Sequence, residues 1–240
     1  MRVGAFQMLI LSVLLYGSVF VASNWLADKL SADWIVGAMM LFYVLSVAFF
    51  VFFYKGKDRT PLFLPDRVSS RKCLYFLPMI SVIAVNLLFT EQGVLKAGDF
   101  MLMLAVAVGE ELFFRLCPFV VFGERRPLLC VLLPSALFSA MHLVNLISTD
   151  DVYFVMLQTA TAFAVGLCFS LSVLITKRVG ACILLHVLIN ITGMGERLYG
   201  FYAAGIVSAM ICFLYAARLF CVALPQPKNK TTTYKERNKT

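Results

Sequence analysis

The chain has 240 residues, of which 61% are hydrophobic and only 14% are charged, and its mean hydropathy is +0.89. Soluble domains carry roughly 25% charged residues, so this composition excludes an ordinary soluble domain and predicts an integral membrane protein. The net charge is +8, but the basic residues gather in one set of loops and in the tail, so the charge does not indicate a nucleic-acid partner.

The apolar stretches are long enough for membrane helices, which need about 20 residues, and they lack the short alternating pattern of an outer-membrane barrel. We predict an all-α fold, a bundle of about eight transmembrane helices. The eight segments run over residues 3–23, 34–54, 73–90, 100–122, 128–147, 152–175, 179–192 and 198–221. The predicted domain organisation is a single transmembrane domain over 1–224, followed by a basic, disordered tail over 225–240.

Positive charge sets the expected orientation. With the amino terminus inside, seventeen Lys and Arg residues fall in the inner loops and the tail, and three fall outside. Membrane proteins concentrate Lys and Arg in their cytoplasmic loops, so this bias predicts that both termini are cytoplasmic.

The ionisable residues inside the apolar segments are few. The only two histidines, His142 and His186, lie in such segments, and a third segment carries Glu110, Glu111 and Arg115. Ionisable side chains are costly at membrane depth and usually face one another or a water-filled cavity. We therefore predict that these five residues share one buried reactive site.

The acidic motif divides into a pair and a single residue. Glu111 and Arg115 are four residues apart with the acid first, which is the favourable order for a helical ion pair. Glu110 points about 100° away around the helix, so Arg115 can neutralise only Glu111. A buried glutamate without a local partner suits a general base. A salt bridge that only fixes helix packing is the alternative for Glu111 and Arg115.

Each histidine has a partner at the same spacing. Phe138 lies four residues before His142 and is expected to pack on the same helix face. Asn190 lies four residues after His186, so both side chains can donate hydrogen bonds toward one point, as the stabilisation of an oxyanion requires. Interhelical hydrogen bonding is the structural alternative for this second pair.

Other polar residues in these segments leave alternatives open. Ser139 shares the face of His142 but has no orienting acid on its helix, so a water activated by Glu110 is a simpler expectation than a Ser–His dyad. We expect no cofactor, although two histidines and a carboxylate form a known zinc set and zinc stays the alternative. The HExxH signature is absent. Asn86 and Asn145 are expected to make only interhelical hydrogen bonds.

The patterns EExxxR, FxxxH and HxxxN, in this order over about residues 100–192, resemble the CAAX-protease and bacteriocin-processing family, also called the Abi family. The resemblance implies an eight-helix intramembrane endopeptidase that works without metal. It also implies that Glu110 and His142 activate a water while His186 and Asn190 stabilise the oxyanion. The expected site residues are Glu110, His142, His186 and Asn190 as the catalytic set, and Glu111, Arg115 and Phe138 as the supporting set.

The expected surroundings follow from the resemblance. They are a lipid bilayer, namely a bacterial cytoplasmic membrane, and a peptide or membrane-protein substrate. Prenylated CAAX proteins and secreted peptides are both family substrates, and these residues do not select between them or set an oligomeric state. The alternatives are a non-proteolytic immunity or scaffold protein, and a transporter that uses the carboxylates as a proton relay. A proton relay does not need the His186 and Asn190 pair.

Overall fold

The computed structural model describes residues 70–91, 94–122, 126–147, 149–193 and 200–223, together with a few single residues between 10 and 48. The elements of these ranges are all helical. In chain order they are α4 (Ser70–Cys73), η1 (Leu74–Phe76), α5 (Leu77–Phe89), α6 (Ala97–Glu111), η2 (Leu112–Leu116), α7 (Cys117–Phe122), α8 (Pro127–Met141), η4 (His142–Ile147), α9 (Val152–Thr176), α10 (Val179–Thr192) and α11 (Gly200–Ala223). The all-α prediction is therefore confirmed for the described part of the chain.

The predicted segments from residue 73 onward each coincide with helical structure, whereas the first two segments and the tail lie outside the described ranges. Three helical stretches are long and apolar enough to cross a membrane: Pro127–Ile147, Val152–Thr176 and Tyr202–Ala223. Two shorter apolar helices cover Leu74–Phe89 and Val179–Thr192. The chain is an integral membrane protein, while the count of eight spans stays a prediction.

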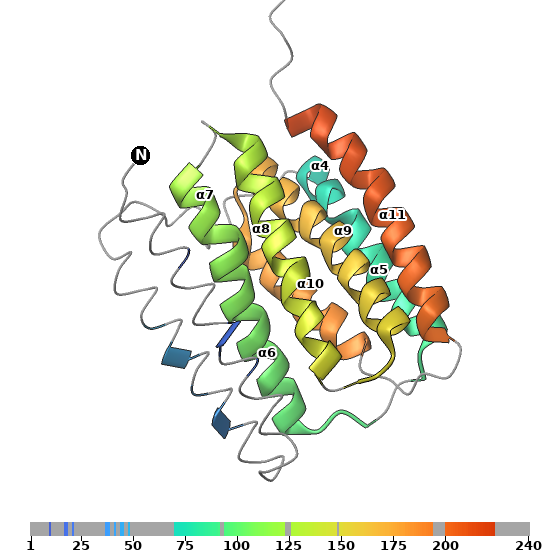
Figure 1. Cartoon of the computed structure of the whole chain (residues 1–240). Coiled ribbons are helices and arrows are strands. Elements are labelled where there is room, and N and C mark those ends of the chain that lie inside the picture. Colours follow the sequence, from blue (N-terminus) through green and yellow to red (C-terminus); the bar gives the residue numbers. More distant parts are fainter. Residues whose placement is uncertain are drawn as a thin grey trace, which may run out of the picture.

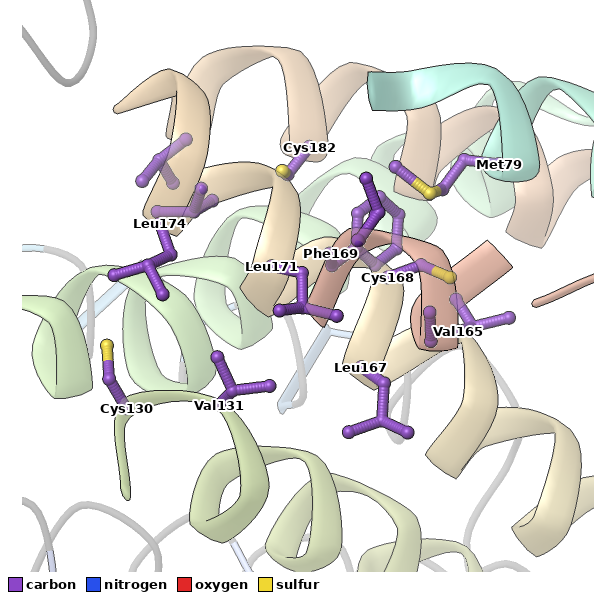
Figure 2. Close-up of a cluster of buried hydrophobic side chains, with 14 of the residues drawn as sticks. Met79, Cys130, Val131, Val165, Leu167, Cys168, Phe169, Leu171, Leu174 and Cys182 are labelled. Carbon is purple, nitrogen blue, oxygen red and sulfur yellow. The ribbon is translucent and has the colours of Figure 1, made fainter. Parts of the chain in front are cut away.

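Helix α9 lies in the middle of the described bundle, with α8 on one side and α11 on the other (Figure 1). It is hydrophobic all round, and its second half is buried almost completely from Ala164 to Leu174. Its side chains form the main hydrophobic core with Met79 of α5, Val131 of α8 and Cys182 of α10, as Figure 2 shows. A central helix without a polar face is typical of a bundle that has apolar surroundings on every side.

Close approach of α8 and α9 depends on a small residue. A Cβ added at Gly166 of α9 would lie 3.3 Å from the Ser135 Cα of α8, which is tighter than ordinary van der Waals contact. The Ser135 hydroxyl donates to the Val131 carbonyl within its own helix and lies 3.4 Å from the Ser170 hydroxyl. Small and hydroxyl-bearing residues at membrane helix interfaces let the backbones approach in this way.

The segment predicted as one helix over 100–122 is interrupted by a π-helical turn. Helix α6 ends at Glu111, η2 is a π-helix, and the Cys117 N–H donates to the Leu112 carbonyl five residues earlier. Pro118 supplies a physical reason, since a proline has no N–H and its ring collides with the carbonyl four residues before it in a regular α-helix. The widened turn directly follows Glu110 and Glu111, and such turns are frequent at functional sites.

Candidate functional site

The three motifs meet inside the bundle. The acidic motif occupies the end of α6 and the π-turn η2, the second motif lies at the end of α8 and the start of η4, and the third lies in α10. Glu111 and Arg115 are almost completely buried, with 0% and 2% of their surface exposed. Glu110 and His186 are also buried, whereas Asn190 is partly buried. Four of the five ionisable residues predicted to share a buried site are thus buried, and the fifth, His142, is partly buried.

Glu111 and Arg115 form the predicted ion pair. Arg115 Nη1 lies 3.0 Å from Glu111 Oε1. The contact has the distance of an ion pair without the angles of a hydrogen bond, and within the described residues neither Glu111 Oε2 nor any guanidinium nitrogen has a hydrogen-bond partner. The guanidinium carbon lies instead over two aromatic rings, 4.6 Å from the Phe138 centroid and 5.1 Å from the Phe169 centroid. Charge and ring contacts together stabilise this buried cation.

His186 bridges the two glutamates. Its Nδ1 lies 2.8 Å from Glu111 Oε1, and its Nε2 lies 3.3 Å from Glu110 Oε2. A ring with both nitrogens facing carboxylates either carries two N–H groups or meets a protonated carboxyl. The prediction placed His186 opposite an oxyanion; here its Nδ1 is held by Glu111 and its Nε2 reaches the Glu110 carboxyl. The acidic motif and the third motif are thus joined through a direct contact that the helical spacing alone does not contain.

His142 is oriented by its own helix. Because α8 tightens into a 3₁₀ turn here, the His142 backbone N–H donates to the Ser139 and Ala140 carbonyls. The Phe138 carbonyl, which a regular α-helix would pair with that N–H, accepts from the His142 ring, with Nδ1 at 3.0 Å. A carbonyl only accepts, so Nδ1 carries the hydrogen. In the neutral ring Nε2 is then an acceptor, free of hydrogen and suited to orient a water.

Phe138 links the motifs through its ring. It makes edge contacts with His142 and His186, with centroids 5.1 Å and 5.9 Å apart. The predicted packing of Phe138 on His142 is therefore confirmed, and the two histidines lie around one aromatic ring. His142 also lies close enough to Glu110 and His186 to interact with them through Coulomb forces.

Sequence reasoning missed two aromatic residues of the site. Phe169 of α9 stacks on His186 with centroids 5.7 Å apart and an interplanar angle of 28°. Phe114 of η2 makes an edge contact with Phe138 at 5.4 Å. Both lie in apolar stretches where phenylalanine carries no distinctive signal, although Phe114 lies within the acidic motif. Phe138 and Phe169 thus lie against both Arg115 and His186, and Phe114 packs behind Phe138.

Other polar residues have structural partners. The Ser139 hydroxyl donates to the Thr159 carbonyl at 2.8 Å, a contact that competes with any Ser–His dyad. The Asn145 amide donates to the Gln158 side chain at 2.7 Å, an interhelical contact of the expected kind. Within the described part of the chain, no three or more His, Cys, Asp or Glu side chains have an arrangement that could hold a metal ion.

Fold and site together define a helical membrane protein with an enclosed cluster of two carboxylates, two histidines and a guanidinium. Residues 97–192 match the family model described as "Rce1-like: Type II CAAX prenyl endopeptidase Rce1-like". The match covers all three motifs and confirms the resemblance to the CAAX-protease family. Because this is a family of proteases, the match supports peptidase activity in general without identifying a substrate. Neither the comparison with curated proteins nor the comparison with solved structures finds a significant match.

Proposed function

We propose that the protein is an intramembrane endopeptidase that hydrolyses a peptide bond with a water activated by Glu110. The observation that carries this proposal is the approach of Glu110 Oε2 and His186 Nε2 to 3.3 Å inside a buried site. A potential base and a potential hydrogen-bond donor thus face the same small region. If the acidic motif served only helix packing, the Glu111–Arg115 ion pair would be enough, and a second buried carboxyl at Glu110 would not be needed.

The residues have separate roles in the proposed reaction. Glu110 accepts a proton from the water, whose oxygen forms a bond to the scissile carbonyl carbon. His142, with Nδ1–H held by the Phe138 carbonyl, accepts a hydrogen bond from that water through Nε2. The proton then passes from Glu110 to the amide nitrogen, and the C–N bond breaks to give a carboxylic acid and an amine. The acid's proton then passes to the amine, which leaves a carboxylate and an ammonium group.

The oxyanion is assigned to the third motif. Arg115 lies at ion-pair distance from Glu111, and Glu111 accepts from His186 Nδ1 and so aims Nε2 into the site. When a substrate carbonyl enters, the Nε2–H of a protonated His186 turns from Glu110 to the developing oxyanion, with the Asn190 amide as second donor. One such donor contributes about 10²–10³ in turnover. No bound metal takes part in this proposal, and zinc is the alternative that a chelation experiment decides.

The substrate in this proposal is a membrane-associated peptide or protein. Prenylated CAAX carboxyl termini are the first class to test, because the matched family model is that of a prenyl endopeptidase. Both chain termini are proposed to lie in the cytoplasm, in accordance with the distribution of Lys and Arg.

An unbiased comparison of cleavage products tests the function. Membranes from cells that express the wild type or Glu110→Gln are compared by labelling and sequencing new protein amino termini. We expect termini that are present with the wild type and absent with the variant at equal protein abundance. Identical sets of termini would contradict the proposal and favour a non-proteolytic immunity or scaffold protein.

A further inference from the structure

Helix α5, which lies before the matched segment, holds the end of α10 through side-chain hydrogen bonds. The Asn86 amide donates to the Ile189 carbonyl and to the Thr192 hydroxyl, each at 3.3 Å. The single hydroxyl hydrogen of Thr90 is shared between the Asn86 carbonyl at 2.6 Å and the Thr192 carbonyl of α10 at 3.0 Å. We define Asn86, Thr90 and Thr192 as the α5–α10 clamp.

The contacts add donors to carbonyl groups in the last turn of α10. The last four carbonyls of a helix have no partner within it, and in a membrane such groups are costly without one. The Ile189 carbonyl accepts from the Gly193 N–H at 2.9 Å and from Asn86, while the Thr192 carbonyl accepts from Thr90. The Thr192 hydroxyl adds a bond to the Leu188 carbonyl at 2.7 Å, so its orientation is also fixed.

These bonds act where the third motif ends. The Ile189 carbonyl belongs to the peptide unit that continues directly into Asn190, so a donor fixed on α5 restrains the position and direction of the Asn190 Cα. His186 lies one turn earlier and is itself held by Glu111 of α6. Helix α10 is therefore held near its middle by the acidic motif and at its carboxyl-terminal end by α5.

We infer that Asn86 is a positioning residue for the Asn190 amide, acting through the Ile189–Asn190 peptide unit. This inference rests on the proposed function, because Asn190 needs a reaction in which to act. Asn86 itself does not touch the reacting atoms. Misplacement by a fraction of an ångström reduces turnover more than substrate binding, because an oxyanion donor acts chiefly in the transition state.

A double-mutant cycle tests the inference. The probe is an internally quenched synthetic peptide that spans the strongest cleavage site found by the amino-terminal comparison, assayed with purified protein. We expect Asn86→Leu to lower kcat roughly tenfold with KM changed less than about twofold. In the Asn190→Ala background the same change is expected to lower kcat less than about twofold, because the positioned group is gone.

Controls separate positioning from folding. Ser81→Ala is the matched control, because the Ser81 hydroxyl lies on the same helix but bonds to the Leu77 carbonyl of α5 itself; it is expected to leave kcat unchanged. If Asn86→Leu does not fold, the nearly isosteric Thr90→Val replaces it in the same cycle, with a loss of roughly threefold. Equal losses of kcat with and without Asn190, or no loss from the single variant, would overturn the inference. A wild type that cleaves nothing would refute the proposed function instead, and the positioning role with it.

Discussion

Neutralising Glu111 is expected to destabilise the fold through Arg115. In Glu111→Gln the guanidinium loses the only charge within 3.0 Å that the described residues give it, and His186 Nδ1 loses its charged acceptor at 2.8 Å. Removal of one partner from a buried ion pair costs roughly 3–5 kcal/mol. The two ring contacts to Phe138 and Phe169 persist in the variant, and the native pair lacks hydrogen-bond angles, so the lower end, about 3 kcal/mol, is expected.

The assay is thermal unfolding of the purified protein in lipid nanodiscs. For a domain of this size 1 kcal/mol corresponds to a shift in Tm of about 2–4 °C, so Glu111→Gln should lower Tm by roughly 6–12 °C. Unfolding can be followed by the reaction of a thiol dye with the buried cysteines, such as Cys168 and Cys212, which are fully enclosed and not in disulfides.

Two variants control this measurement. Glu110→Gln makes the same chemical change at the neighbouring position, where the contact to His186 is longer, at 3.3 Å. Because one polar contact contributes about 1 kcal/mol, this variant should shift Tm by less than about 3 °C while abolishing cleavage. Glu111→Gln with Arg115→Met removes both charges and should recover most of the lost stability. If Glu111→Gln has the same Tm as the wild type, or if the double variant is less stable than the single one, the buried ion pair does not stabilise the fold.

Three further predictions concern the membrane topology, the aromatic contact to His186 and the exposed carboxyl of Asp151. Cysteine labelling from outside intact cells should miss Leu62→Cys and reach Asp150→Cys, and the reverse pattern would overturn the orientation. Phe169→Leu should lower turnover by about tenfold while costing less than about 1.5 kcal/mol, since it keeps an apolar filler but removes the ring stacked on the histidine; unchanged kcat would contradict this. The Tyr202 hydroxyl donates to Asp151 at 2.6 Å and lowers the pKa of that exposed carboxyl. A lowered folded-state pKa gives stability that is present above the unfolded value of about 4 and is lost as pH falls through the folded value. Tyr202→Phe should therefore show a smaller fall in Tm between pH 6 and pH 3 than the wild type, and an equal fall would refute this link.

Contacts within one helix could be predicted from the sequence. The Glu111–Arg115 pair and the Phe138–His142 contact both follow from a spacing of four residues, and the structure contains both. The distribution of apolar residues likewise predicted each helix from residue 73 onward, because a membrane helix must be apolar over its whole length.

Contacts between helices could not be predicted in the same way. The bond from His186 to Glu111 joins residues 75 positions apart and depends on how α10 packs against α6. Phe169 lies in a helix that is apolar on every face, so nothing in the sequence distinguishes it as a neighbour of the site. The π-turn η2 had a signal in Pro118, but a proline predicts a break in the helix without giving its form.

The central claim is that Glu110 activates a water without a bound metal. It is tested most directly by the cleavage rate of the quenched peptide with purified protein after exhaustive chelation, measured for the wild type and for Glu110→Gln. We expect the wild type to keep its full rate and the variant to lose at least about 10³-fold, the middle of the range for a general base, with Tm nearly unchanged. Wild-type activity that disappears with the chelator and returns with zinc, or a Glu110→Gln rate within tenfold of the wild type, would contradict the mechanism.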